Sequence, residues 1–244
     1  MSLRVAILEC GVPSSDILRS WYPGYGAMFE ELLCSEEKPD LQLVVTKWLV
    51  DHDGATYPEL DDVDVILISG SKHSAYLDVS WINRLVEFTS QALRSPAVRV
   101  VGICFGHQIL GRAMGAPVEK NKLGWEVSVC EIDLNATGKL LFKRDKLSLQ
   151  FSHQDIVLSC PAHVQNLGSS PKCDIQGFFW PGRLLSLQGH PEFNERIMRE
   201  TLKMKQQTSS LTEDEFQDAM IRVAQKHDGH LVGQVLLKFM LGQE

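Results

Sequence analysis

The feature that most constrains the fold is an alternation of short apolar runs with helical patterns over the first 115 residues. The run VDVILI at Val63–Ile68 is nearly continuous, which is typical of a strand buried on both faces of a parallel sheet. The alternation predicts an α/β fold with a mostly parallel central sheet and helices on both faces. The other expected strands are Leu3–Leu8, Leu41–Leu49 and Val98–Gly102, and the expected helices are Gly26–Leu33, Ser80–Leu93 and Phe105–Met114.

The sequence after Gly115 has a different pattern. Three short alternating segments predict a small antiparallel sheet, and Leu184–Gln188 indicates a return to the central sheet. The chain then reads as helical to its end, and Thr212 with Glu215 forms a capping-box signature. A single domain over residues 1–244 follows, with its core over about 3–206 and a C-terminal helical extension over about 207–244. The antiparallel segments are Glu126–Leu134, Leu147–Phe151 and Asp174–Phe179, and the helices are Glu192–Gln206, Thr212–Lys226 and Gly229–Leu241.

Charge and cysteine usage exclude several classes of protein. The net charge is −7 and no basic run is present, so we expect no nucleic-acid partner. The six cysteines form no C-x-x-C pair and have no histidine at zinc-finger spacing, which argues against a metal site and favours reduced thiols. No stretch is long and apolar enough to span a membrane, and the first strand begins too early for a signal peptide. We therefore expect a cytoplasmic protein without a membrane partner.

The stretch GICFGHQ, residues 102–108, places Cys104 between an apolar strand and an amphipathic helix. The spacing G-x-C-x-G is that of a nucleophile elbow, in which small neighbours let the backbone turn sharply. A thiolate at a helix N-terminus is stabilised by the positive end of the helix dipole. The Phe105 N–H would supply half of an oxyanion hole, and the segment Ser69-Gly70-Ser71, after the strand Val63–Ile68, is the candidate for the second donor. Cys104 is therefore the candidate nucleophile.

A cysteine nucleophile needs a base that a third group holds in place. His190 follows the strand Leu184–Gln188, whose carboxyl end would lie beside the other strand ends of a parallel sheet. Glu192 lies two residues further on and could accept a hydrogen bond from the second imidazole nitrogen, which would fix the tautomer. His190 and Glu192 are therefore the candidate base and orienting acid.

The pair of motifs C-F-G-H-Q and G-H-P-E resembles those of the class I glutamine amidotransferase family. The resemblance covers about residues 3–206 and is strongest to stand-alone fungal proteins of the guanylate-synthase-like branch and to plant γ-glutamyl peptidases. It implies a flavodoxin-like three-layer fold and a triad of Cys104, His190 and Glu192. It also implies an oxyanion hole formed by the N–H groups of Gly70 and Phe105.

The same resemblance implies where the substrate binds. Gln108 ends the nucleophile motif and would lie against the bound glutamyl group. Ser152, His153 and Asp155 match an S-H-x-D segment that lies near the α-amino and carboxyl groups of the substrate. His107 is a further polar residue near the site, for which a structural or pocket-wall role is expected.

Three functions are compatible with these residues. The leading hypothesis is a cysteine-dependent hydrolase that cleaves a γ-glutamyl amide, in glutamine or in a γ-glutamyl peptide such as glutathione or its conjugates, through a γ-glutamyl thioester and without a cofactor. The alternative is a glutaminase subunit that delivers ammonia to a separate synthase partner. The third is a catalytically silent binding protein, which the presence of all three triad residues disfavours. The candidates for selecting the leaving group are the loops Lys72–Asp78 and Asn121–Trp125, together with the C-terminal helices beyond residue 206 that the resemblance does not cover.

Overall fold

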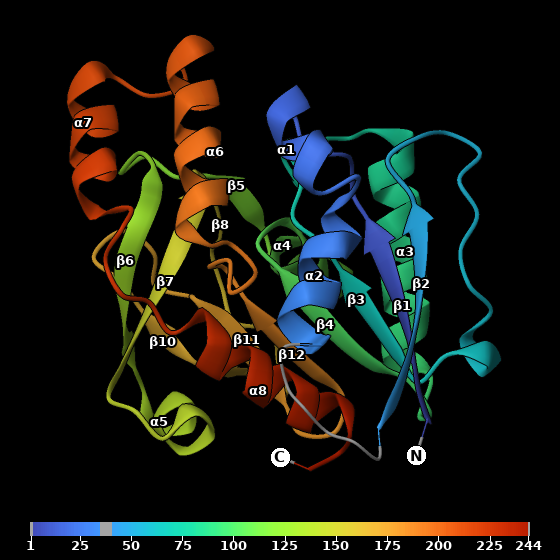
Figure 1. Cartoon of the computed structure of the whole chain (residues 1–244). Helices are drawn as coiled ribbons and strands as arrows, with labels where there is room; N and C mark the ends of the chain where they lie inside the picture. Colours follow the sequence, from blue (N-terminus) through green and yellow to red (C-terminus); the bar gives the residue numbers. More distant parts are fainter. Residues whose placement is uncertain (1, 35–40, 244) are drawn as a thin grey trace.

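The central element of the computed structural model, which describes residues 2–34 and 41–243, is a seven-stranded sheet. Its order is β2-β1-β3-β4-β12-β11-β9 (Figure 1). The first five strands run parallel, and β11 pairs antiparallel with both of its neighbours. The mostly parallel sheet is thus confirmed. The strands are β1 (Ser2–Glu9), β2 (Gln42–Leu49), β3 (Val65–Ile68), β4 (Arg99–Ile103), β9 (Gln165–Asn166), β11 (Gly177–Trp180) and β12 (Leu184–Leu187).

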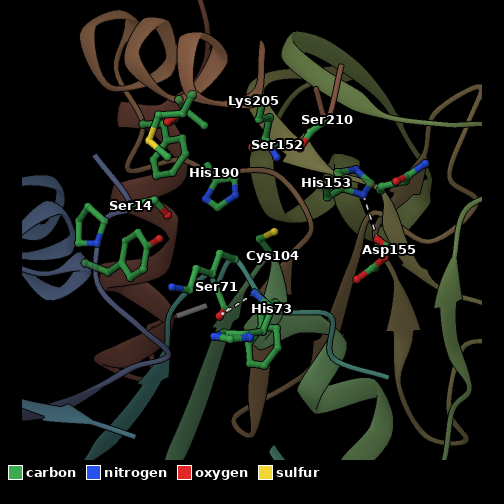
Figure 2. Close-up of a pocket in the computed structure, with 18 of the residues that line it drawn as sticks. Ser14, Ser71, His73, Cys104, Ser152, His153, Asp155, His190, Lys205 and Ser210 are labelled. Carbon is green, nitrogen blue, oxygen red and sulfur yellow. Dashed lines mark hydrogen bonds between the residues drawn. The ribbon is translucent and has the colours of Figure 1, made fainter. Parts of the chain in front are cut away.

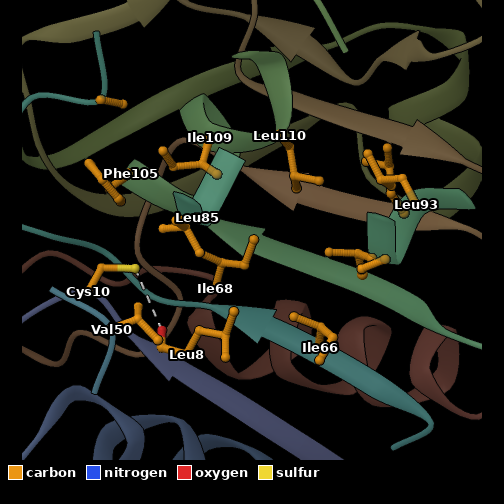
Figure 3. Packing of buried hydrophobic residues seen from close by; sticks show 14 of the residues in the cluster. Leu8, Cys10, Val50, Ile66, Ile68, Leu85, Leu93, Phe105, Ile109 and Leu110 are labelled. Atoms are coloured by element: carbon orange, nitrogen blue, oxygen red, sulfur yellow. Dashed lines mark hydrogen bonds between the residues drawn. The ribbon is translucent and has the colours of Figure 1, made fainter. Parts of the chain in front are cut away.

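Helices cover both faces of this sheet, which gives the expected three layers. Strand β3 shows why its sequence is continuously apolar: alternate side chains enter opposite cores. Ile66 and Ile68 pack toward α3 and α4, as Figure 3 shows, whereas Val65 and Leu67 pack toward α2 and α8. The helices are α2 (Tyr25–Cys34), α3 (Ser80–Arg94), α4 (Phe105–Ala113) and α8 (Gly229–Met240).

Two small antiparallel sheets lie beside the central one, and they confirm the pattern read after Gly115. The larger has the order β10-β6-β7, and the smaller pairs β5 with β8. The third expected segment, Asp174–Phe179, was assigned to the wrong sheet: it forms β11, which begins at Gly177 and belongs to the central sheet, because it pairs antiparallel with β12 and β9 there. The elements of this region are β5 (Val118–Lys120), β6 (Glu126–Leu134), α5 (Ala136–Phe142), β7 (Lys146–His153), β8 (Asp155–Val157) and β10 (Gly168–Ser169).

The C-terminal helices pack on different parts of the molecule. Helices α6 (Glu195–Gln207) and α7 (Glu213–Arg222) share a core with β6, and α8 packs into the main core. The capping box of Thr212 and Glu215 is present at the start of α7. None of the helices in the described ranges combines the length and apolar character needed to cross a bilayer.

One expected helix starts at a different residue, and one helix was not predicted. The helix expected from Glu192 begins at Glu195, because the Asn194 side chain accepts a hydrogen bond from the Ile197 N–H and caps it there. Glu192 therefore precedes the helix. A short helix, α1 (Asp16–Trp21), was not predicted; Ser15 caps it, and its single buried residue, Leu18, gives too little periodicity to detect.

Candidate active site

Cys104 occupies a sharp turn between β4 and α4. Its φ is 52° and its ψ is −102°, a conformation that non-glycine residues rarely adopt. The Cys104 N–H donates to the Leu187 carbonyl over 2.8 Å, and the Cys104 carbonyl accepts from the Gln108 N–H, the first turn of α4, over 3.1 Å. The surrounding structure thus holds one residue in a strained backbone conformation, as a nucleophile elbow requires.

The two glycines that flank Cys104 let the helix lie directly against the sheet. A Cβ atom on Gly106 would lie 2.2 Å from the Ile68 carbonyl oxygen, and one on Gly102 would lie 2.6 Å from the Gly106 carbonyl oxygen. Both distances are far inside van der Waals contact, and backbone atoms cannot move aside as a flexible side chain can. The G-x-C-x-G spacing is therefore required by the close approach of β3, β4 and α4.

Gly106→Ala is expected to destabilise the protein by more than about 2 kcal/mol, because the added methyl group meets backbone that is fixed on both sides. Gly111→Ala, in the same helix, is the matched control. Its Cβ would meet only the Val157 side chain at 3.1 Å, and the gain in helix propensity offsets that contact. Urea unfolding of both variants measures the difference; equal stabilities would contradict the packing explanation.

His190 lies beyond the end of β12 and beside Cys104, as Figure 2 shows. Its Nδ1 is 2.8 Å from the Glu192 Oε1, and both side chains are buried. The imidazole ring stacks on the Phe193 ring with 4.1 Å between centroids. The backbone N–H of His190 donates to the backbone carbonyl of Gln150. The bond to Glu192 occupies Nδ1, so the second ring nitrogen is left for the thiol.

The charges around His190 favour its protonated form. Burial lowers the pKa of the imidazole, but the negative charges of Glu192 and of a Cys104 thiolate outweigh it and raise the pKa to about 10. The Glu192 carboxylate supports the positive charge of the imidazolium, which lies beside the Cys104 sulfur. The imidazolium can therefore act as a proton donor beside the candidate nucleophile.

Gly70 and Phe105 lie where the oxyanion hole was expected. A Cβ on Gly70 would be 2.9 Å from the His190 ring and 3.9 Å from the Cys104 Cβ, so the glycine is beside both residues. Within the described ranges, neither the Gly70 N–H nor the Phe105 N–H donates to another group of the protein. Two free backbone donors beside one thiol are suited to bind a developing oxyanion.

The residues expected to bind the substrate lie near Cys104, and Figure 2 shows His153 and Asp155 on the side of Cys104 that faces away from His190. Gln108 donates from Nε2 to the Asp155 carbonyl over 2.8 Å and to the Gln188 side chain over 3.0 Å. The His153 Nδ1 is 3.0 Å from the Asp155 carbonyl. With Ser152 these side chains line the same cleft as Cys104 and His190. The structure therefore brings all four together, and burial raises the pKa of the Asp155 carboxyl.

Glu126 is a residue of this region that the sequence reading missed. Its Oε2 is 3.0 Å from the His153 Nε2, and both side chains are buried. Burial raises the pKa of the Glu126 carboxyl, but hydrogen bonds from His153, Ser170 and Gln176 outweigh it and lower that pKa. Glu126 therefore places a buried carboxylate against the His153 ring. No sequence signal pointed to Glu126, because it stands where a polar residue is expected in the alternation of β6.

His107 does not line the cleft, which agrees with a structural role. It is fully buried, its Nδ1 is 2.9 Å from the Ser186 Oγ, and its ring packs 4.4 Å from the ring of Phe178. Burial, together with the charge of His153, lowers the pKa of the imidazole to about 3. His107 is therefore neutral and belongs to the packing beneath the site.

The cleft above Cys104 has a volume of about 680 Å³, within the range of small-molecule sites. As expected, the loop around His73 and Trp125 form part of its wall. The expectation for the C-terminal helices was wrong: α7 and α8 supply none of the lining residues, because they pack away from the cleft, and the preceding helix α6 supplies them instead. The loop before α1 and α1 itself, including Leu18 and Arg19, form a further part that was not anticipated. Nowhere in residues 2–34 and 41–243 do three or more His, Cys, Asp or Glu side chains come together as metal ligands could.

Residues 29–206 match the sequence profile of the family described as glutamine amidotransferase class-I, and the chain belongs to this family. A glutamine amidotransferase-like protein of Schizosaccharomyces pombe is 33% identical and aligns over 99% of this chain and 100% of its own length. Gamma-glutamyl peptidase 3 of Arabidopsis thaliana is 32% identical and aligns over 84% of this chain and 82% of its own length. The expected family is thus confirmed.

A solved structure supports the fold independently. A glutamine amidotransferase from Thermotoga maritima superposes with a TM-score of 0.75 at 18% identity, over 98% of each chain. At that identity the similarity concerns the fold alone, and it confirms the flavodoxin-like three-layer arrangement.

Proposed function

We propose that this protein is a cysteine-dependent hydrolase that cleaves a γ-glutamyl amide bond. The observation that carries the proposal is the buried His190–Glu192 pair beside Cys104, on a strained turn that opens into a cleft. The strained backbone of Cys104 and the burial of His190 with Glu192 both cost free energy of folding. The two residues supply the nucleophile and the acid–base group of acyl transfer. Family membership and the names of the plant relatives favour a γ-glutamyl substrate.

In the first half of the reaction, the Cys104 thiolate attacks the γ-carbonyl carbon, and the electron pair of the C=O bond moves to oxygen. The Gly70 and Phe105 N–H groups would stabilise that oxyanion. The carbonyl then re-forms, the C–N bond breaks, and the His190 imidazolium gives its proton to the departing amine. A γ-glutamyl thioester and a neutral imidazole remain.

In the second half, the neutral His190 takes a proton from water while the water oxygen attacks the thioester carbonyl. Collapse of the second tetrahedral species breaks the C–S bond, which releases glutamate and restores the thiolate and the imidazolium. Glu192 holds the tautomer throughout and stabilises the imidazolium. No step requires a metal or an organic cofactor.

The γ-glutamyl end of the substrate is assigned to Gln108, Ser152, His153 and Asp155. The Asp155 carboxylate suits an α-ammonium group, and the neighbouring polar side chains suit the α-carboxylate. We further propose that the chain acts as one domain over residues 1–244, because α8 packs into the same core as β1 and β4 and is not a separate appendage.

The purified protein, incubated alone with glutamine, glutathione and glutathione conjugates, is expected to release glutamate from at least one of them. Every residue that the proposed reaction uses comes from this chain, so turnover should not need a second protein. A glutaminase subunit that serves a separate synthase would be nearly inactive until its partner is added. Glutamate measured by an enzyme-coupled assay decides between these functions, and no release from any of the compounds would contradict the hydrolase proposal.

A further inference from the structure

The cleft is lined by more positive than negative side chains, although the whole protein carries a net charge of −7. Among its lining residues in the described ranges, the only carboxylate is Asp155. The cationic residues of the lining are Arg19, Lys72, Lys120 and Lys205. A concentration of positive charge in one cleft of an acidic protein indicates that the ligand is anionic.

The four cations are not equivalent. Arg19 forms an ion pair with Asp16 and donates a hydrogen bond to the Pro13 carbonyl, so its guanidinium already has an anionic partner. Lys72 and Lys120 are exposed at the edge of the cleft, where water and salt screen their charges. Lys205 is different, because it is partly buried on the cleft side of α6. It is the cation best placed to act on a bound ligand.

Among the residues that the structure describes, no carboxylate lies within salt-bridge distance of the Lys205 ammonium. Its Nζ lies 3.7 Å from the centroid of the Trp125 ring, a cation–π contact that fixes the side chain without neutralising it. Figure 2 shows Lys205 above Ser152, on the opposite side of Cys104 from His73. Burial lowers the pKa of the ammonium to about 8, although the charges of Cys104 and Asp155 partly offset this. A half-buried ammonium without a counter-ion is an open site for an anion.

The charges of a γ-glutamyl group alone do not account for this arrangement. That group carries one ammonium and one carboxylate, so it is neutral overall, and Asp155 is available for the ammonium. Glutamine brings no further charge. With the α-ammonium assigned to Asp155 and the α-carboxylate to the neighbouring polar side chains, a carboxylate beyond the scissile bond, such as the C-terminal end of a γ-glutamyl peptide, would give Lys205 the ion-pair partner that it lacks in the protein.

We infer that Lys205 binds a carboxylate on the leaving portion of the substrate, so that the enzyme prefers γ-glutamyl peptides that end in a free carboxylate over glutamine. This inference rests on the proposed function and names the substrate class of the same site. Lys205 acts as a specificity-determining residue, and its charge-assisted hydrogen bond is made to a group that does not react.

The test compares γ-glutamylglycine with γ-glutamylglycinamide, two substrates of nearly equal size that differ in the terminal carboxylate. In the parent protein, kcat/KM is expected to be at least about tenfold higher for the acid. Lys205→Met should remove most of that preference by raising KM for the acid while leaving the amide little changed. Lys203→Met is the matched control, because it removes the same charge from the same helix at an exposed position that contacts Glu200.

The outcomes separate the inference from the proposed function. If Lys205→Met weakens acid and amide equally, or if the parent shows no preference, the inference is overturned while the hydrolase proposal stands. If the parent cleaves neither substrate, the hydrolase proposal fails for these compounds. Calorimetric binding of both to the Cys104→Ala variant then still decides the role of Lys205: tighter binding of the acid that depends on Lys205 supports it, and equal binding overturns it.

Discussion

Replacing Cys104 with alanine is expected to lower the rate of glutamate release by about 10⁴-fold or more, because the covalent route through a thioester is lost. The protein should remain folded, since only a sulfur atom is removed and alanine keeps the Cβ that the turn accommodates. Glutamate release is measured on the best γ-glutamyl substrate of the parent, and circular dichroism of the variant verifies the fold.

Cys160→Ala is the matched control for that experiment, because Cys160 is a free cysteine at an exposed position and does not line the cleft. Its activity should equal that of the parent. If Cys104→Ala retained activity within tenfold of the parent, Cys104 could not be the nucleophile, and the hydrolase would have to use another group.

Glu192→Gln is expected to lower kcat by between about 10² and 10⁴-fold, because glutamine neither fixes the His190 tautomer nor stabilises its positive charge. The bond that it replaces is short, at 2.8 Å, and buried on both sides. The loss should be no larger than that of Cys104→Ala, because the thiol and the imidazole remain.

The pH dependence of kcat is a second measurement that tests the Glu192→Gln variant. Glu192 is one of the groups that raise the pKa of His190 to about 10, and the imidazolium is present below that pH and lost above it. Removing the carboxylate lowers the pKa, so the alkaline limb of the kcat profile should move to lower pH. An unchanged rate and an unchanged limb would show that Glu192 has only a packing role beside Phe193.

The regularity of the fold explains how much of it the sequence could predict. The strands of the central sheet appear as continuous apolar runs, because neighbours such as Val65 and Ile66 enter opposite cores, and the long helices carry a helical periodicity. The short helix α1 carries almost none, since only Leu18 is buried. The start of α6 was misplaced because the Asn194 cap competes with acidic residues nearby that also favour a helix N-terminus.

The residues of the candidate site also fall into two groups, those that the sequence predicts and those that it does not. Cys104, His190 and Gly70 follow the carboxyl ends of three neighbouring parallel strands. Because these ends lie at one edge of the sheet, the position of each residue after its strand implies that the three meet. Glu126 and Lys205 could not be found by that rule. They come from β6 and α6, whose placement over the sheet depends on tertiary packing that no local pattern encodes.

The central claim is that a γ-glutamyl group is carried on Cys104, and trapping that species tests it most directly. The protein is mixed with a γ-glutamyl substrate, quenched in acid within the first turnovers, digested and mapped by mass spectrometry. The account predicts a γ-glutamyl adduct on the peptide that contains Cys104, and no adduct in the Cys104→Ala variant. An adduct on another of the six cysteines, or one that persists in the variant, would contradict it.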